Sequence, residues 1–330
     1  MDTLRSEFSA DALRSLAWAG DDLVDWIGGR RIRMDGCVER FGTGYTYRFD
    51  AVVGLGEVGV MFEACGTKGR VVRSNGALAS AQFVPLGIEE LREIDRSFYC
   101  AENVAFPVCV FTLPDGRSAL AHAPRSYNEL EIELLDGTPL TRRQGTCDDV
   151  FHARLSVSPD GRWLLSNGWV WHPWTVAQVY DVARALTEPT HLSGPGLALD
   201  FGASFKGEAE AAVISGDRLI VSGSAECPML SVVELPSGKL QAAHPLRVSL
   251  GTQLVAWGRD HVLALDGEVR VVALADGEVV TTLDADTRGS SRPAIPTAPP
   301  KPPYIAIDPV RPRLAIGRAT GEIVTFTLSS

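Results

Sequence analysis

The densest chemical signal in the sequence is a group of tryptophans around a short turn. Residues 156–174, SVSPDGRWLLSNGWVWHPW, hold four of the seven tryptophans in the chain. Trp163 lies just after the Pro-Asp-Gly turn, two residues beyond its glycine, where we expect an aromatic side chain in the core. The other three rings either fold back and anchor the loop, or are exposed and bind a ligand or a protein partner. The candidate binding residues here are Trp169, Trp171, His172 and Trp174.

Signatures of catalysis and metal binding are missing from the sequence. No Gly-x-Ser-x-Gly nucleophile elbow occurs, and the Ser-Gly-Ser run at 222–224 reads as a strand end. The Gly-Thr-Lys-Gly run at 66–69 matches the end of a P-loop, but the preceding glycine and the following helix are missing. The histidines and cysteines are scattered, without the short spacing that a zinc site needs. We therefore predict no catalytic residues, no metal, no cofactor and reduced cysteines.

The charge and hydropathy of the chain argue against nucleic acid and membrane partners. The net charge is -10 and the pI is near 5.2, so a phosphate backbone or an anionic lipid surface would be repelled on average. The N-terminal segment is interrupted by charges, and no window approaches the ~20 apolar residues of a membrane span. We expect a cytoplasmic protein, and the Ala-, Arg- and Gly-rich usage is typical of a high-GC bacterial genome.

A strand-turn-strand pattern surrounds the tryptophans and recurs along the chain. Residues 152–158, HARLSVS, alternate apolar and polar side chains, a Pro-Asp-Gly turn follows, and RWLLSNG begins the return. Residues 175–182, TVAQVYDV, supply a third strand. The segment FPVCVFTLPDGRSALAHAP at 106–124 repeats the pattern with the same turn. Seven such copies are present, each of roughly forty to fifty residues, which is the period of a propeller blade.

The repeats resemble those of seven-bladed WD40- and YVTN-type β-propellers over nearly the whole chain. The best match is Ser-Pro-Asp-Gly-Arg-Trp-Leu at 158–164 with Val-Tyr-Asp at 179–181, although no copy carries the Gly-His opening of WD40 repeats. The resemblance implies an all-β single domain, 1–330, of seven four-stranded antiparallel blades, with residues 1–10 closing the ring as an outer strand. The approximate blades are 13–47, 50–85, 104–142, 151–187, 208–243, 251–284 and 303–330.

Two segments interrupt the repeats. PLGIEELREIDRSFY at 85–99 has four apolar residues at helical spacing, which predicts one short amphipathic helix between the second and third blades. These four are Ile88, Leu91, Ile94 and Phe98. Residues 287–303, TRGSSRPAIPTAPPKPP, hold six prolines and cannot form the interior of a regular strand or helix. This proline-rich connection is either a surface linker between the last two blades or a polyproline II ligand for an aromatic groove.

The resemblance also implies where a binding face lies. In WD40 propellers the connection between the second and third strands of a blade lies on the face most used for binding, and in this chain that connection carries the tryptophans. Equivalent connections in other blades add Arg125, Tyr127 and Arg318. Because Trp, Tyr and Arg together are typical of protein interfaces, we predict a non-enzymatic scaffold that binds a protein partner.

An alternative use of the same fold is a small-molecule hydrolase or sensor with its site in the axial funnel. Lactone-hydrolysing propellers bring acidic and amide side chains together at the axis, where a metal would accompany them. Glu63, Asp25 and Asn167 lie near strand ends and are the candidates for such a site, although a turn-capping or solvated role is the more usual one for each of them. A third possibility is a purely structural subunit, for which the tryptophans would be dispensable.

Overall fold

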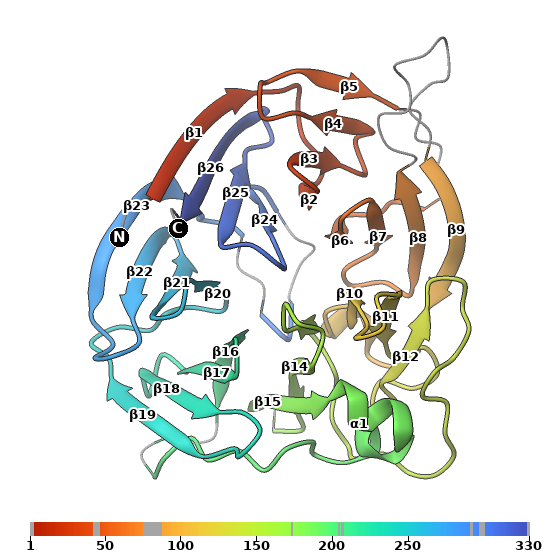
Figure 1. Cartoon of the computed structure of the whole chain (residues 1–330), viewed down its shortest axis with the longest axis vertical. Coiled ribbons are helices and arrows are strands. Elements are labelled where there is room, and N and C mark those ends of the chain that lie inside the picture. Colours follow the sequence, from red (N-terminus) through yellow and green to blue (C-terminus); the bar gives the residue numbers. More distant parts are fainter. Residues whose placement is uncertain are drawn as a thin grey trace.

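The chain folds into a ring of seven antiparallel sheets around a common axis (Figure 1). The structure is a computed structural model that describes residues 3–41, 47–74, 88–172, 174–203, 205, 208–290, 293–296 and 301–328. The sheets follow one another along the chain with their strands ordered outward from the axis, and the N-terminal strand is outermost in the last sheet. The protein is therefore a seven-bladed β-propeller, which confirms the fold expected from the repeats.

We number the sheets as blades 1 to 7 in chain order. Blade 1 contains β2 (Ala17–Ala19), β3 (Asp22–Asp25), β4 (Arg30–Ile32) and β5 (Val38–Arg40). Blade 2 contains β6 (Ala51–Leu55), β7 (Val58–Phe62), β8 (Lys68–Ser74) and β9 (Ile88–Asp95). Blade 3 contains β10 (Val108–Thr112), β11 (Ser118–His122) and β12 (Glu131–Leu134).

The second half of the ring has the same organisation. Blade 4 contains β13 (Ser156–Val157), β14 (Trp163–Val170) and β15 (Trp174–Asp181). Blade 5 contains β16 (Ala209–Ser215), β17 (Arg218–Gly223), β18 (Met229–Glu234) and β19 (Leu240–Pro245). Blade 6 contains β20 (Leu254–Trp257), β21 (His261–Asp266), β22 (Glu268–Ala273) and β23 (Val279–Asp286). Blade 7 contains β24 (Tyr304–Ile307), β25 (Arg313–Gly317), β26 (Glu322–Leu328) and β1 (Thr3–Ser9).

The hydrophobic core is divided among the contacts between neighbouring blades. Seven apolar clusters each combine side chains from two adjacent sheets, so that every blade is buried on both faces. Trp163, the tryptophan expected in the core, is fully buried between blades 4 and 5. Trp26 and Trp257 are buried in the same way between blades 1 and 2 and between blades 6 and 7. No single blade can therefore keep its core without its neighbours.

The turn that recurs in the sequence has a clear structural cause. In the turn between β13 and β14, the side chain of Asp160 accepts a hydrogen bond from the backbone N–H of Arg162 at 3.2 Å. Gly161 adopts a φ of 75°, and a Cβ there would lie 2.3 Å from the carbonyl oxygen of Thr112 in blade 3. The Pro-Asp-Gly turn thus joins two strands and also packs closely against the neighbouring blade.

The two ends of the chain meet in blade 7. The N-terminal strand β1 pairs antiparallel with β26, from Thr3 opposite Leu328 to Ser9 opposite Glu322 (Figure 1). The backbone N–H of Ala10 continues this contact with a hydrogen bond to the carbonyl oxygen of Gly321. The ring is therefore closed by a sheet that contains both ends of the domain.

The predicted helix over 85–99 is wrong. Residues 85–87 lie outside the described residues, and Ile88–Asp95 form strand β9, the outer strand of blade 2. The register shifts there, because Val71 pairs with Arg92 while Val72 pairs with Glu90. This bulge inserts Leu91 as an extra residue, so apolar side chains recur every three positions and imitate helical spacing.

The short helix lies elsewhere, after blade 4. Helix α1 spans Val182–Thr187, and the side chain of Asp181 accepts a hydrogen bond from the backbone N–H of Arg184 as its N-cap. It precedes the 3-10 turn η3 (Pro189–Ser193) in the connection to blade 5. Among the residues that the structure describes, no helix has the length and hydropathy to cross a membrane.

In the described part of the chain, five of the seven blades have the expected four strands, whereas blades 3 and 4 have three strands each. In blade 3, Leu140 donates a backbone hydrogen bond to Ile132, whose own N–H donates to the hydroxyl of Thr141. In blade 4, Leu197 donates to the carbonyl oxygen of Val179 on β15. Irregular segments thus partly satisfy the outer edges of these blades, which repeat counting alone does not reveal.

Removing residues 1–9 should destabilise the whole ring, because β26 would lose its outer partner. With net contributions of about 0.5–1.5 kcal/mol for each ladder hydrogen bond, the loss should be on the order of 3 kcal/mol or more. Denaturant unfolding of the full chain and the shortened chain would measure it. An unchanged free energy of unfolding would show that β1 does not contribute to closure.

Candidate functional site

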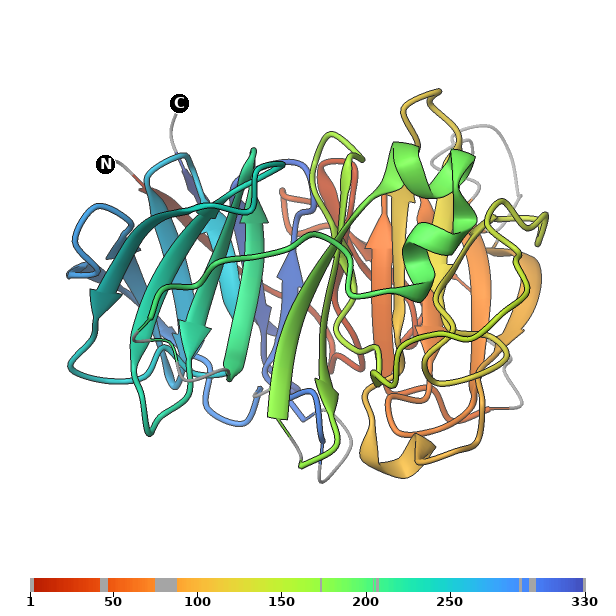
Figure 2. The same ribbon diagram turned by 90° about the horizontal axis from the view of Figure 1, so that it is seen from below.

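The tryptophan-rich stretch forms a tight hairpin in blade 4. We expected Trp169 and Trp174 in a loop, but they lie in β14 and β15, where Val170 pairs with Trp174. The turn therefore begins at Trp171, and His172 adopts a φ of 102°. In Figure 2 this green hairpin ends on the lower side of the ring, opposite helix α1 and both termini.

Trp169 is held by a backbone bridge to Phe151. Each of these two residues donates its N–H to the carbonyl oxygen of the other, at 2.9 Å and 3.1 Å. A Cβ at Gly168 would lie 2.0 Å from the carbonyl oxygen of Phe151, so the approach requires a residue without a side chain. Phe151 and Trp169 then stack in parallel, with ring centroids 4.1 Å apart and an interplanar angle of 2°.

Three further rings extend this stack into a continuous group from different parts of the chain. Tyr127 stacks on Phe151 with a centroid distance of 4.2 Å, and Tyr99 lies 5.1 Å from Tyr127. Trp171 stands nearly perpendicular to Trp169, with centroids 5.2 Å apart. We call the group the aromatic row, and it consists of Tyr99, Tyr127, Phe151, Trp169 and Trp171.

The centre of the aromatic row is buried and its two ends are exposed. Phe151 is fully buried and Trp169 is 4% exposed. Tyr99 and Trp171 are each 46% exposed, and Trp174 beside the hairpin turn is 52% exposed. Phe98, the residue before Tyr99, is 84% exposed. The two alternatives for the tryptophans, anchoring the loop and being exposed, therefore apply to different residues. Trp169 anchors the loop, whereas Trp171 and Trp174 face solvent.

Part of the proline-rich connection covers the buried centre of the row. Ala294 is fully buried in the same apolar cluster as Phe151 and Trp169, and Ile295 packs against that cluster. The carbonyl oxygen of Ala294 accepts a hydrogen bond from the N–H of Ala105 at 3.3 Å. In Figure 1 this short blue segment lies near the centre of the ring beside β10 and β14.

The proline-rich connection is thus more than the surface linker that we considered. Its residues 293–296 pack on an aromatic surface of their own chain, and they bend at Ala294 and Ile295. Residues 291–292 and 297–300, for which the same two alternatives were considered, lie outside the described residues.

A buried arginine positions the end of the row that contains Tyr99. Arg96 donates from Nε to the carbonyl oxygen of Gly66 and from Nη2 to that of Val104, each at 2.7 Å. Its guanidinium also lies 5.1 Å from the centre of the Phe106 ring. Burial lowers the pKa of Arg96 to about 10, so it remains charged at neutral pH. The connection between blades 2 and 3 is therefore fixed by charge-assisted hydrogen bonds.

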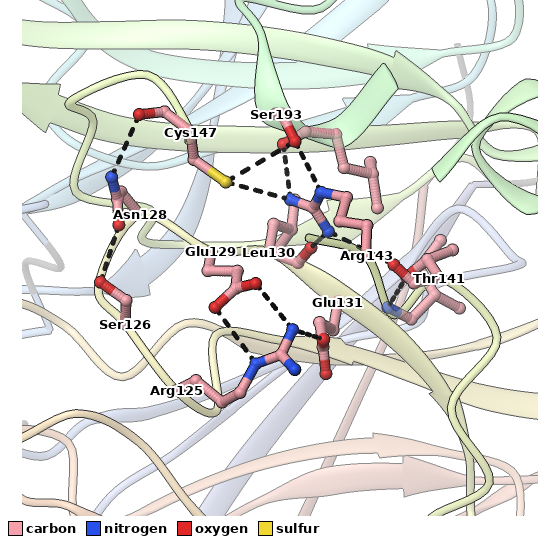
Figure 3. A network of polar contacts seen from close by, with 12 residues as sticks. Arg125, Ser126, Asn128, Glu129, Leu130, Glu131, Thr141, Arg143, Cys147 and Ser193 are labelled. Carbon is pink, nitrogen blue, oxygen red and sulfur yellow. Dashed lines mark hydrogen bonds and ion pairs between the residues drawn. The ribbon is translucent and has the colours of Figure 1, made fainter. Parts of the chain in front are cut away.

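Tyr127 and Arg125, two predicted site residues, lie together in blade 3. The hydroxyl of Tyr127 donates to Oδ1 of Asp149 at 2.6 Å, and this hydrogen bond raises the pKa of Tyr127 to about 12. Arg125 is ion-paired with Glu129 and Glu131 (Figure 3). Tyr127 is therefore part of the aromatic row, whereas the charge of Arg125 is already balanced within its own loop.

Arg143 makes several hydrogen bonds in the connection between blades 3 and 4, close to the loop that contains Arg125 and Tyr127. It donates to the carbonyl oxygen of Leu130 and to the hydroxyl of Ser193, each at 2.7 Å (Figure 3). It also donates to the carbonyl oxygen of Leu192 at 3.1 Å and contacts the sulfur of Cys147 at 3.5 Å. These bonds tie blade 3 to the η3 turn, so the segment that leads to Phe151 is held at several points.

Arg318 lies apart from the aromatic row, and the three funnel candidates make contacts of their own outside it. Arg318 follows β25 in blade 7, where its side chain lies 3.7 Å from Glu322. Asp25 accepts hydrogen bonds from Ser15 and from backbone groups in blade 1, and Asn167 donates to the carbonyl oxygens of Val176 and Ala209.

The funnel candidates therefore have separate structural surroundings. Glu63 follows β7, and its backbone is hydrogen-bonded to Lys68 and Gly66 within its own blade. Within the described part of the chain, no group of three or more His, Cys, Asp or Glu side chains is arranged to hold a metal ion.

Sequence reasoning did not identify Tyr99 and Phe151 as members of the site. Both lie in crossover connections between blades, and the sequence separates them from the hairpin by many residues. Only the bridge at Gly168 and the position of η2 (Ala101–Asn103) place them beside Trp169. The sequence gives only a weak signal for them, because the crossover at 96–107 carries Phe98, Tyr99 and Phe106 and no pattern singles out Tyr99.

His152 lies buried directly behind the row. Its Nδ1 is 2.9 Å from the hydroxyl of Ser166, and its backbone N–H donates to the carbonyl oxygen of Tyr127. Burial lowers the pKa of His152 to about 4, and the charge of Arg143 acts in the same direction. The imidazole is therefore neutral in the folded protein at neutral pH.

Comparisons with known proteins support the fold and do not assign a family. No family model and no curated protein matches this sequence. The chain is similar to the computationally designed Ika8 protein, whose crystal structure aligns with a TM-score of 0.53 at 15% sequence identity. That alignment covers 94% of this chain and 83% of the designed protein. At this identity the similarity shows the propeller fold alone.

Gly168→Ala should destabilise the protein, because its Cβ would collide with the backbone of Phe151. Overpacking at a fixed backbone contact costs about 1–3 kcal/mol, and we expect a loss of that size in denaturant unfolding. Gly194→Ala is the matched control, since a Cβ there meets no atom within 4 Å and its φ is -107°. Equal stability of the two variants would show that the bridge to Trp169 does not need the glycine.

His152 should make the folded state sensitive to mild acid. Unfolded histidine titrates near pH 6.5 whereas folded His152 titrates near 4, so the unfolded chain binds more protons between these values. The free energy of unfolding should therefore fall as the pH falls from 6.5 to 4, by on the order of 3 kcal/mol from this residue.

The comparison with His152→Gln isolates this contribution, because the other titrating groups are common to both proteins. We expect a shallower loss of stability in the variant when unfolding is measured from pH 7 to pH 4.5. Parallel profiles for the two proteins would contradict the assignment.

Proposed function

We propose that this protein is a non-enzymatic interaction scaffold that binds a protein partner within a cytoplasmic assembly. The binding surface consists of the exposed ends of the aromatic row together with Trp174, beside His172. Arg318 is not part of this surface, because it lies in a different blade and contacts Glu322.

One observation carries the proposal. Large aromatic rings are exposed on one face while their neighbours in the same stack are buried and fixed. Trp171 contacts both Phe151 and Trp169 at right angles, so its orientation is set before any partner arrives. A prepositioned ring loses little conformational freedom on binding, which is the property of interface hot spots.

The fold is consistent with this role. A closed ring of blades gives a rigid platform, and the crossover connections of several blades contribute to one face. The row receives residues from the connection between blades 2 and 3, from blade 3, from the connection between blades 3 and 4, and from blade 4. A partner that covers the row would therefore contact several parts of the chain at once.

The test is a pull-down from a lysate of the source cells with purified tagged protein. The double variant Trp171→Ala, Trp174→Ala should lose the partner at least tenfold, because hot-spot rings contribute about 2 kcal/mol or more each. The control is Val279→Ala, Val280→Ala on β23 in blade 6, which also removes two exposed apolar side chains.

Circular dichroism must first show that both variants fold. A partner that is retained by the control and lost by the tryptophan variant would support the proposal. Equal capture of the same proteins by the wild type and both variants would contradict it.

A further inference from the structure

We propose that residues 293–296 are a removable cover of the aromatic row, and that the partner displaces them when it binds. We call these four residues, Pro-Ala-Ile-Pro, the covering segment. This inference rests on the proposed function and concerns the regulation of the same surface. The chain would then inhibit its own binding face until a partner with a higher affinity for the centre of the row replaces the segment.

The covering segment lies at the centre of the row, whereas both ends of the row are exposed. Ala294 is fully buried in one apolar cluster with Phe151 and Trp169. Tyr99 and Trp171, at the two ends, are each 46% exposed. A partner that contacts both ends therefore has to cross the centre, where the covering segment lies.

Few contacts hold the covering segment on the row. Its fully buried side chain is the single methyl group of Ala294, whereas Pro293, Ile295 and Pro296 are half-buried. The hydrogen bond from the backbone N–H of Ala105 to the carbonyl oxygen of Ala294 is 3.3 Å long, which is long for such a bond. The segment bends at Ala294 and Ile295, so no helix or strand ladder supports it. Its displacement would break little of the described structure.

The covered centre contains two polar atoms that the covering segment does not satisfy. Nε1 of Trp169 and Oγ1 of Thr175 are buried, and neither has a hydrogen-bond partner among the described residues. Trp169 pairs with Thr175 across β14 and β15, so the two side chains lie on the same face of the hairpin. A buried donor without an acceptor costs free energy. A partner that brings an acceptor oxygen to these groups would therefore bind the centre better than the covering segment does.

Removal of the cover would join the exposed ends into one aromatic surface. Phe151 and Trp169 are stacked in parallel, and Tyr127 and Trp171 both contact this pair. The backbone bridge between Phe151 and Trp169 does not involve the covering segment, so the rings keep their positions without it. The affinity for the partner is then set by its contacts with the whole row, less the free energy needed to displace the segment.

The variant Ala294→Gln tests whether the covering segment can be released. A glutamine side chain is too large and too polar for this buried position, so the segment should leave the rings. Hydroxyl-radical footprinting should then show several-fold faster oxidation of Trp169 than in the wild type, with an unchanged circular dichroism spectrum. Ala183→Gln is the matched control, because Ala183 is exposed on helix α1, on the opposite side of the ring (Figure 2).

The same variant should also capture more of the partner in the pull-down. We expect an increase of roughly threefold or more over the wild type and over Ala183→Gln, because the partner no longer has to displace the segment. This increase should disappear when Trp171→Ala and Trp174→Ala are added to Ala294→Gln.

A disulfide that locks the cover should have the opposite effect. Ala105 and Ala294 are joined by a backbone hydrogen bond, so the double variant Ala105→Cys, Ala294→Cys places two thiols close enough to be bridged. Cys100→Ser is added because the Cys100 side chain packs against the same cluster. Once mass spectrometry has shown the disulfide, the oxidised protein should capture roughly threefold less partner than the same protein after reduction with dithiothreitol.

Three results would overturn the inference. Equal oxidation of Trp169 in Ala294→Gln and in the wild type would show that the segment does not cover the row. Equal capture of the partner by Ala294→Gln and the wild type, or by the oxidised and reduced forms of the double cysteine variant, would show that the partner and the segment do not compete.

The failure of this inference can be told apart from the failure of the proposed function. If the wild type captures a partner that requires Trp171 and Trp174 while the cover variants have no effect, the binding face stands and only the cover is wrong. If no form of the protein captures a partner through these two tryptophans, the proposed function is wrong and the inference falls with it.

Discussion

The two hydrogen bonds between Phe151 and Trp169 are the contact on which the aromatic row depends. They join a crossover connection to the end of β14, and Gly168 leaves the space that they need. With this bridge in place the two rings stack in parallel, and Tyr127 and Trp171 pack against the pair. Without it, the hairpin tip and the crossover would be separate loops with isolated aromatic residues.

Closure of the ring is the second requirement, because it determines which connections become neighbours. The seven clusters between adjacent blades hold each sheet at its place, and an eighth apolar cluster lies on one face around Trp169. Ala294 reaches that cluster from the connection between blades 6 and 7. Residues distant in sequence therefore form this face. Ala294 of the proline-rich connection covers the centre of the aromatic row, at Phe151 and Trp169.

The sequence predicted the fold well because turns and alternation are local. Seven copies of the strand pattern indicated seven blades, and the position of Trp163 after its turn indicated burial. The helix at 85–99 was wrong because the bulge at Leu91 reproduces helical spacing. For the proposed binding surface, the sequence pointed to the tryptophans as a group but could not separate exposed Trp171 and Trp174 from buried Trp169. It missed Tyr99 and Phe151, since their proximity depends on how the blades pack.

Hydroxyl-radical footprinting of the folded protein, read by mass spectrometry, tests most directly whether the aromatic row is buried at its centre and exposed at its ends. We predict rapid oxidation of Phe98, Tyr99, Trp171 and Trp174, and strong protection of Phe151 and Trp169. Equal oxidation of Trp169 and Trp171 would contradict the account, because the stack, the bridge and the covering segment would then not hold the row as described.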